Sequence, residues 1–160
     1  MPFPEFDAPS PHFSADPPHE RLGVCFHHTV LGFAETIAFM QTPASRVSYH
    51  LVVAPDGARA RLVPEERVAW HAGRSAFRGR EQCNAFLLGL AFAGDSRVAP
   101  LTEAQLESAI EWLRPRWHPR AWTLDWMTDH RQIAPGRKDD LAPGEWERLR
   151  QRLEREFAPR

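Results

Sequence analysis

The stretch 129–140, near the C-terminal end, holds the densest group of residues that could do chemistry. His130 and Asp140 are both possible metal ligands, and the cation Lys138 lies between them in a loop that contains a Pro-Gly pair. Loops often carry functional residues because a rigid scaffold can hold them in place. A solvated basic turn with an incidental histidine has the same composition. The stretch alone leaves both interpretations open.

A second histidine site lies far upstream, where His27 and His28 follow the apolar run 22–26. Such a run is typical of a buried strand, and α/β folds place function at strand ends. Alternation along a strand points the two rings in opposite directions, so at most one faces a given site. His27, His130 and Asp140 would together supply two imidazoles and a carboxylate, the protein ligand set of a catalytic zinc site. A histidine at a strand end is often structural, however, and spacing does not show that the three residues converge.

The other histidines and possible nucleophiles give competing interpretations. His71 follows Trp70 and is interpreted as a site-wall or hydrogen-bonded core residue rather than a ligand. His50 adjoins Tyr49, and one of the two faces the core, because neighbouring strand residues point to opposite faces. Cys25 lies inside an apolar strand, and the chain has neither a Gly-x-Ser-x-Gly nor a His-Glu-x-x-His motif. A bound zinc ion is therefore the favoured route to chemistry.

The elements that must position these residues alternate between strands and helices, which favours an α/β fold. The turn 55–57, Pro-Asp-Gly, joins two strands as a hairpin, so we expect a mixed central β-sheet flanked by α-helices. Thr102 and Gln105 form a capping box that begins a helix, which Pro115 ends or kinks. Strands are expected at 22–26, 47–53, 58–63, 86–93 and 124–128, with 68–73 a strand or a loop, and helices at 33–40, 103–114 and 145–157.

The proline-rich segment 1–20 is predicted to be an extended arm rather than a secondary-structure element, because proline fixes φ and removes a backbone donor. His12 and His19, which lie in this segment, are expected to be solvated. Residues 21–160 then form a single domain, long enough to bury a core without disulfides.

Composition and charge exclude several classes of partner. A net charge of −1 gives no electrostatic footprint for nucleic acid or an anionic membrane. The longest apolar run, 85–94, is about half the length that a membrane-spanning helix needs. Cys25 and Cys83 are too few for a secreted disulfide framework, and the first residues lack the pattern of an export signal. We expect a cytoplasmic monomer with no nucleic-acid or membrane partner.

Four groups of motifs occur in order: His27-His28-Thr29; Ser48-Tyr49-His50; Trp70-His71-Ala72-Gly73 with Gly79-Arg80-Glu81 and Cys83-Asn84; and the loop from His130 through Ile133-Ala134-Pro135-Gly136-Arg137-Lys138 to Asp140. Together they resemble the zinc-dependent N-acetylmuramoyl-L-alanine amidases, whose fold is shared by amidase-type phage lysozymes and peptidoglycan recognition proteins. The third and fourth groups are most similar to the cytoplasmic AmpD branch, which recycles 1,6-anhydromuropeptides. The likeness covers about residues 21–157.

The resemblance implies that His27, His130 and Asp140 bind Zn²⁺. It also implies that Lys138 stabilises the negative charge that develops on the amide oxygen during hydrolysis. The bond to be cut is then the amide between the lactyl group of N-acetylmuramic acid and L-alanine, in a muropeptide or in peptidoglycan. The residues implied to contact the substrate are His28, which is not a ligand, and Trp70, His71, Arg80 and Asn84.

The chain departs from the AmpD pattern at the position of the catalytic acid and base. Ala91 stands where that branch carries a glutamate, and an alanine cannot transfer a proton. The phage and animal relatives use a tyrosine instead, in a run similar to Tyr49-His50-Leu51, so we predict that Tyr49 orients the attacking water. Gln82 replaces a basic residue that bears on substrate recognition, and Leu141-Ala142 replaces a Pro-Gly pair.

Three functions follow from this comparison of motifs. The favoured one is a cytoplasmic zinc amidase that acts on soluble muropeptides. A phage-type lysin acting on intact peptidoglycan is an alternative of the same class. Ala91 also motivates a muropeptide-binding protein that keeps zinc for structure and has lost turnover.

Overall fold

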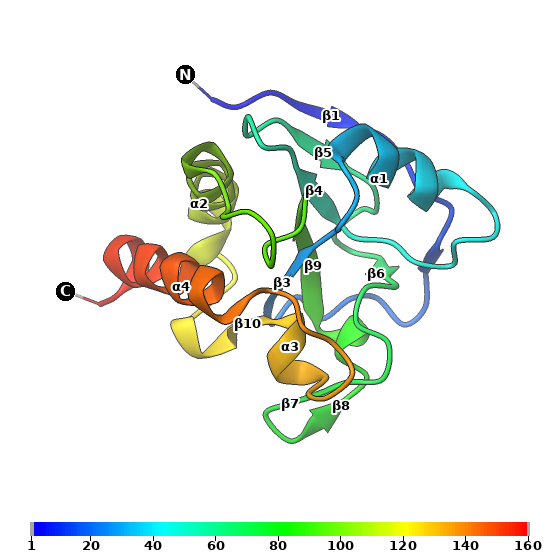
Figure 1. Ribbon diagram of the computed structural model, residues 1–160. Helices are drawn as coiled ribbons and strands as arrows, with labels where there is room; N and C mark the ends of the chain where they lie inside the picture. Colours follow the sequence, from blue (N-terminus) through cyan, green and yellow to red (C-terminus); the bar gives the residue numbers. More distant parts are fainter. Residues whose placement is uncertain (1, 160) are drawn as a thin grey trace.

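The fold is built on a mixed six-stranded β-sheet with the strand order β1-β5-β4-β9-β3-β10 (Figure 1). The structure, a computed structural model, describes residues 2–159. β4, β9, β3 and β10 are parallel neighbours, whereas β5 pairs antiparallel with β4 and parallel with β1. The predicted α/β class with a mixed central sheet is confirmed. The strands are β1 (Glu5–Asp7), β3 (Gly23–His28), β4 (Leu51–Val53), β5 (Arg59–Arg61), β9 (Leu87–Phe92) and β10 (Met127–Asp129).

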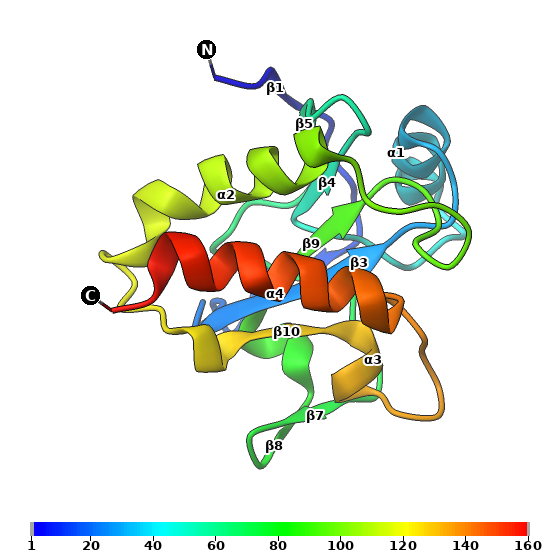
Figure 2. The same ribbon diagram turned by 60° about the vertical axis from the view of Figure 1, so that its left-hand side comes forward.

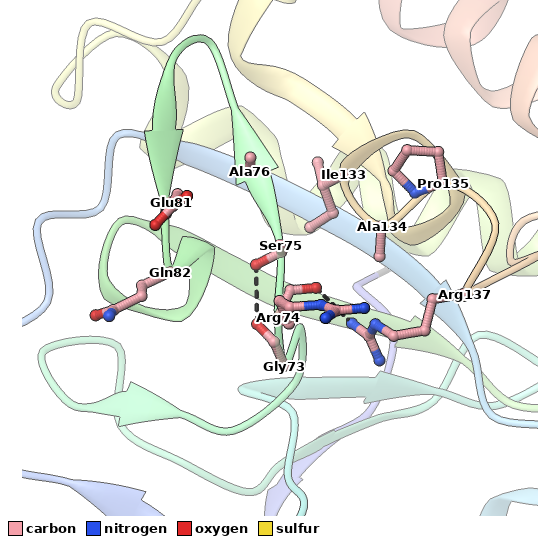
Figure 3. A pocket seen from close by; sticks show the side chains of 10 residues that line it. All are labelled: Gly73, Arg74, Ser75, Ala76, Glu81, Gln82, Ile133, Ala134, Pro135 and Arg137. Carbon is pink, nitrogen blue, oxygen red and sulfur yellow. Dashed lines mark hydrogen bonds between the residues drawn. The ribbon is translucent and has the colours of Figure 1, made fainter.

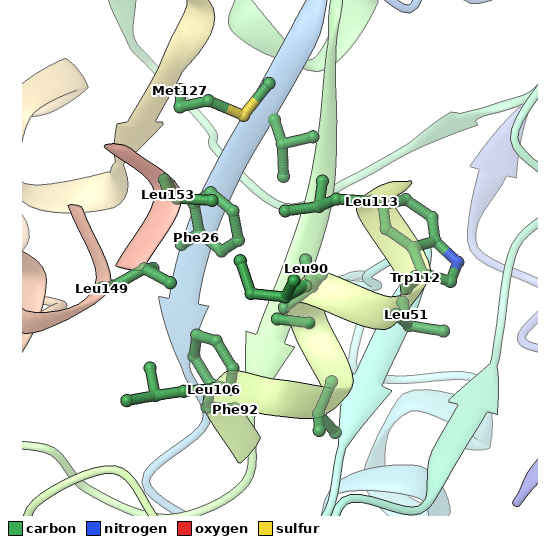
Figure 4. Close-up of a cluster of buried hydrophobic side chains, with 14 of the residues drawn as sticks. Phe26, Leu51, Leu90, Phe92, Leu106, Trp112, Leu113, Met127, Leu149 and Leu153 are labelled. Atoms are coloured by element: carbon green, nitrogen blue, oxygen red, sulfur yellow. The ribbon is translucent and has the colours of Figure 1, made fainter. Parts of the chain in front are cut away.

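Two long helices, α2 (Glu103–Trp117) and α4 (Pro143–Phe157), cover one face of this sheet (Figure 2). The side chains of Phe26 and Leu90 point to this face and join the apolar residues of both helices in one buried cluster (Figure 4). The predicted capping box begins α2, since the Thr102 hydroxyl accepts from the Gln105 N–H at 3.0 Å. The helix continues through Pro115 to its end at Trp117, so the proline does not end it.

The opposite face of the sheet carries α1 (Phe33–Gln41) and several short elements. Because side chains alternate along a strand, His27 points to this face while Phe26 points to the helices. Ala91 is the register partner of His27 on β9 and therefore lies on the same face. This face, at the carboxyl ends of the parallel strands, is where candidate site residues can meet.

The N-terminal segment is extended, as expected, but the expectation that it forms no element is wrong. β1 extends the central sheet beside β5, and β2 (Phe13–Ser14) pairs antiparallel with β6 (Val68–Ala69). His12 and His19 are buried rather than solvated. Their Nε2 atoms bond the backbone oxygens of Thr42 at 2.7 Å and Leu87 at 3.0 Å. Proline content predicted an extended chain, but it could not show that the chain would lie against a sheet edge.

The remaining elements are short and surround the site. The predicted polar loop 74–84 contains a hairpin of β7 (Ala76–Phe77) and β8 (Arg80–Glu81), followed by the 3-10 turn η1 (Cys83–Ala85). The strand expected at 124–128 starts as the 3-10 turn η2 (Leu124–Trp126), and β10 then leads into α3 (His130–Ile133). Among the helices of residues 2–159, none combines the length and the apolar character that a bilayer crossing requires.

Candidate active site

His27 and His130 meet because they lie at the carboxyl ends of two neighbouring parallel strands. β3 and β10 pair with Phe26 opposite Asp129, and the residue that follows each of these two is a histidine: His27 within β3, and His130 at the start of α3. Asp140 returns to this edge at the end of the loop that follows α3. A hydrogen bond of 2.6 Å from the Arg131 N–H to the Asp140 carbonyl oxygen holds this return. Residue 27 and the stretch 130–140, more than 100 residues apart in sequence, thus bring their side chains together.

The three side chains present one ligand atom each to a common point. The Nδ1 atoms of His27 and His130 are 3.0 Å apart. Oδ2 of Asp140 lies 3.4 Å from Nδ1 of His27, and Oδ1 lies 3.3 Å from Nδ1 of His130. Tetrahedral zinc with ligand bonds of about 2.0–2.1 Å requires ligand atoms about 3.3 Å apart. The spacing therefore fits a tetrahedral metal ion with three protein ligands and one open position.

The hydrogen bonds on the far side of each imidazole assign the tautomers. Nε2 of His130 lies 3.0 Å from the Ala72 carbonyl oxygen, which can only accept, so that nitrogen carries the proton. His71 likewise donates from Nε2 to the Leu87 carbonyl oxygen at 2.8 Å, so its Nδ1 accepts from Nε2 of His27 at 2.9 Å. Both ligand Nδ1 atoms then offer lone pairs beside a carboxylate. Two imidazole lone pairs and a carboxylate that converge in this way form a donor set that fits zinc.

Electrostatics keep His27 and Asp140 in ligand form near neutral pH. Burial lowers the pKa of His27 to about 4, with the nearby His130 adding to this effect and the Asp140 carboxylate opposing it. Burial raises the pKa of Asp140, but the two facing histidines outweigh this and hold it well below its ordinary value. The imidazole of His27 is therefore neutral and the carboxyl of Asp140 is ionised, as metal ligation requires.

A second trio of possible ligands, Cys25, His27 and His71, also lies close together. Its two imidazoles are already joined by the hydrogen bond between Nε2 of His27 and Nδ1 of His71. Burial also raises the pKa of the Cys25 thiol well above its ordinary value, which disfavours the thiolate that a metal would bind. This trio is therefore explained as support for His27 rather than as another metal site.

A cleft of about 300 Å³ opens over His130 and Asp140, and both predicted catalytic side chains line it. Lys138, the only lysine in the chain, lies on its wall beside Asp140 and forms no ion pair with any residue of 2–159. The ring of Tyr49 lies with its centroid 5.0 Å from that of His27. Burial raises the pKa of Tyr49 well above its ordinary value, and Asp140 adds to the effect, so the side chain is a neutral phenol.

Ala91 lies within the site but in an apolar setting. It is fully buried in a cluster with Val52 and Met40, and Tyr49 packs against this cluster. A methyl group therefore occupies the position at which the resemblance implies a glutamate, and the ring of Tyr49 packs beside it. The replacement of glutamate by Tyr49 stays a prediction.

Of the five residues implied to contact substrate, three line the cleft and two do not. Trp70, His71 and His28 line the cleft. Nδ1 of His28 accepts from the Ser96 N–H at 3.1 Å, so its Nε2 carries the proton and can donate to a ligand. Arg80 is exposed and pairs with Glu20. Asn84 is not among the residues that line the cleft, and its side-chain oxygen bonds backbone N–H groups instead.

Sequence reasoning missed the apolar rim of the cleft, which consists of Val30, Leu31, Phe39 and Val47. All four are exposed large hydrophobic residues. A usable signal existed for Phe39, which lies off the apolar stripe of α1 and so cannot face the core. Val30 adopts φ +68°, a strained backbone conformation for a β-branched residue that sequence does not reveal.

Arg137, which the sequence indicates only as one residue of a motif, holds the backbone beside the site in place. Its Nη2 donates to the carbonyl oxygens of Ala72 at 2.6 Å and Arg74 at 2.7 Å. Figure 3 shows Arg137 beside Gly73 and Arg74, at the wall of a second cavity of about 590 Å³. The Ala72 carbonyl oxygen thus receives hydrogen bonds from both Arg137 and the ligand His130.

Comparison with known proteins agrees with this geometry. A family model described as N-acetylmuramoyl-L-alanine amidase matches residues 18–145. The 1,6-anhydro-N-acetylmuramyl-L-alanine amidase AmpD of Salmonella typhimurium (strain SL1344) is 33% identical, over 89% of this chain and 86% of that protein. The crystal structure of a selenomethionine AmpD derivative superposes with a TM-score of 0.78 at 28% identity, covering 94% of this chain and 93% of the other. The amidase AmiD of E. coli, in complex with the substrate anhydro-N-acetylmuramic acid-L-Ala-D-γ-Glu-L-Lys, superposes at 0.70 and 28% identity, covering 87% and 60%.

Proposed function

The chain belongs to the N-acetylmuramoyl-L-alanine amidase family, and from this premise we propose that it is a zinc amidase of muropeptide recycling. Its substrate is a soluble muropeptide that carries 1,6-anhydro-N-acetylmuramic acid, and the amide to L-alanine is hydrolysed. The observation that carries the proposal is the convergence of Nδ1 of His27, Nδ1 of His130 and the Asp140 carboxylate. The names of the AmpD relatives and the substrate in the AmiD complex support the anhydro sugar.

Each polar side chain in the cleft has a proposed part in the reaction. His27, His130 and Asp140 hold zinc, which supplies a Lewis acid for the amide carbonyl and a more acidic water. The Lys138 ammonium stabilises the negative charge that develops on the amide oxygen. The neutral Tyr49 phenol orients the attacking water by hydrogen bonding, since its raised pKa keeps the proton on the oxygen.

The walls of the cleft suit the rest of such a substrate. Val30, Leu31 and Phe39 offer exposed apolar surface to the methyl groups of the lactyl, N-acetyl and alanyl units. Trp70 provides an aromatic face for the sugar ring. The Nε2–H of His28 is a donor for a carbonyl oxygen of the substrate.

We place the protein in the cytoplasm as a monomer. Cys25 and Cys83 are both buried and unpaired, which suits a reducing compartment. Fractionation of cells that produce the full chain tests the location, and sedimentation tests the oligomeric state. Recovery from the periplasm, or a dimer at working concentrations, would contradict this part.

The test of the activity compares two substrates with the zinc-loaded protein. Release of peptide from purified anhydromuropeptide, with little release from intact sacculi, is the expected result. Faster cleavage of sacculi would instead identify the phage-type lysin. Ala91 favours one further candidate, a muropeptide-binding protein without turnover. Tight binding of anhydromuropeptide with no cleavage of either substrate would establish that candidate and refute the enzyme.

A further inference from the structure

A single dipeptide, His71-Ala72, supports both histidine ligands. The His71 ring accepts the Nε2–H of His27 at 2.9 Å, and the Ala72 carbonyl oxygen accepts the Nε2–H of His130 at 3.0 Å. Each bond fixes the orientation of one imidazole and keeps its proton on Nε2, which leaves Nδ1 free to bind a metal. The two ligands therefore depend on the position of the same short segment.

This dipeptide has no strand to hold it, because β6 ends at Ala69. Oδ1 of Asn84 supplies the hydrogen-bond acceptor that a neighbouring strand would otherwise provide. It accepts from the His71 N–H at 3.0 Å and from the Ala72 N–H at 2.8 Å. Within residues 2–159 these two N–H groups have no other acceptor. Removal of Asn84 Oδ1 would leave both without a partner in a part-buried setting.

The surroundings leave the dipeptide little freedom on its other sides. The His71 ring lies directly against β9, where a Cβ added at Gly89 would come within 2.6 Å of Cγ of His71. Arg137 holds the Ala72 carbonyl oxygen from the far side at 2.6 Å. β9 thus restricts the His71 ring and Arg137 restricts the Ala72 carbonyl group. Asn84 is the contact that fixes the backbone N–H groups of the same two residues.

We propose that Asn84 is a positioning residue for the metal centre, acting on both histidine ligands through the His71-Ala72 dipeptide. The inference rests on the proposed function only for the assignment of zinc to His27, His130 and Asp140. A residue that contacts substrate would affect KM and leave zinc affinity unchanged. A positioning residue affects zinc affinity in the absence of any substrate.

The experiment measures the zinc dissociation constant of the purified full chain by competition with a chromophoric chelator. Asn84→Leu is expected to weaken zinc binding about 10- to 100-fold, the range found for partners of metal ligands. Asn84→Asp keeps the acceptor and is expected to bind zinc within about threefold of the wild type, or more tightly because of its charge. Nitrogen NMR of the metal-free protein should show Nε2-protonated His27 and His130 in the wild type and in Asn84→Asp, with mixed tautomers in Asn84→Leu.

Gln105→Leu is the matched control. The Gln105 amide is also buried and also joins backbone groups, donating to the Val53 and Ala93 carbonyl oxygens at 3.2 and 3.0 Å, but away from the ligands. It should lower stability and leave zinc affinity unchanged. A loss of affinity in this control as large as in Asn84→Leu would attribute the effect to general destabilisation and overturn the proposal.

Gly89→Ala provides a second route to the same segment if Asn84→Leu does not fold. The added methyl group displaces the His71 ring, so zinc binding should weaken at least about 10-fold, with the NMR change confined to His27. Wild-type zinc affinity in a folded Asn84→Leu protein, or in Gly89→Ala, would overturn the inference while leaving the amidase intact. Absence of zinc binding by the wild type would instead overturn the metal assignment of the proposed function.

Discussion

Replacing Tyr49 by phenylalanine separates the proposed orientation of the attacking water from folding. Its hydroxyl makes no hydrogen bond to another residue of 2–159, yet it is not among the buried atoms that lack a partner, so it is open to the cleft. Deleting it leaves no buried group unsatisfied, and the ring still packs against the Ala91 cluster. We therefore expect the free energy of unfolding to change by less than about 0.5 kcal/mol.

The effect on turnover should be far larger. Loss of one preorganised hydrogen-bonding group in an active site typically lowers the rate about 10²–10³-fold, which corresponds to about 2.7–4 kcal/mol of barrier. Single-turnover cleavage of anhydromuropeptide, with zinc content measured on the same samples, gives this ratio directly. The zinc dissociation constant should remain at the wild-type value, because the ring still packs beside His27 and the lost hydroxyl bonds neither the ligands nor the His71-Ala72 dipeptide.

A reciprocal variant tests whether Tyr49 stands in for the glutamate of the AmpD branch. Ala91→Glu alone should destabilise the protein by several kcal/mol, because position 91 is fully buried and Tyr49 packs nearby. Tyr49→Ala combined with Ala91→Glu frees the space and should recover part of the activity lost in Tyr49→Ala. A Tyr49→Phe protein that turns over within threefold of the wild type would refute this reasoning, whatever the double variant does.

Three further predictions follow from the same structure. Removal of zinc by a chelator should abolish turnover. Zinc added at about 100 times its dissociation constant should restore turnover and raise the free energy of unfolding in urea by about 2.7 kcal/mol. Activity that persists in metal-free protein would contradict the proposed zinc site. Burial lowers the pKa of His19 to about 4 and that of His50 to about 3, so both are neutral in the fold while the unfolded chain takes up protons below about pH 6.5. The stability of the metal-free protein should therefore be complete above pH 6.5 and fall as the pH drops towards 4, by at most about 1.4 kcal/mol per pH unit for each histidine, and unfolding energies equal at pH 7 and 5 would be inconsistent with their burial. Phe26→Ala should cost about 3–5 kcal/mol in the same assay, since Phe26 is fully buried between β3 and the two long helices, whereas a cost below 1 kcal/mol would show that the core is loosely packed there.

The parts of the fold that sequence predicted are those with strong local patterns. The apolar runs that became β3 and β9, the Pro-Asp-Gly hairpin and the capping box at Thr102 each carry their own signal. β1 and β2 were missed because they are defined by what they pair with, and a proline-rich segment has no local pattern that names a partner strand. The burial of His12 and His19 follows from the same pairing, so it was unpredictable for the same reason.

The candidate site divides along similar lines. Motifs pointed to His27, His130 and Asp140, and the parallel pairing of β3 with β10 explains why the two histidines lie side by side. Asn84 was expected at the substrate because its motif suggested function without specifying a contact. Its two bonds are to backbone N–H groups, and the need for them arises only because the chain leaves β6 before His71. No feature of the sequence predicts the residue at which a strand stops forming backbone hydrogen bonds with its neighbour.

The two faces of β9 explain how one strand can serve both the core and the site. Leu88, Leu90 and Phe92 point to the long helices, where large side chains fill the core. Gly89 and Ala91 alternate with them on the other face, and both are small. Gly89 leaves room for the His71 ring, and Ala91 belongs to the apolar cluster against which Tyr49 packs. We therefore expect a substitution at position 89 to disturb the proposed metal ligands through the His71 ring, and a substitution at position 91 to disturb the packing of Tyr49.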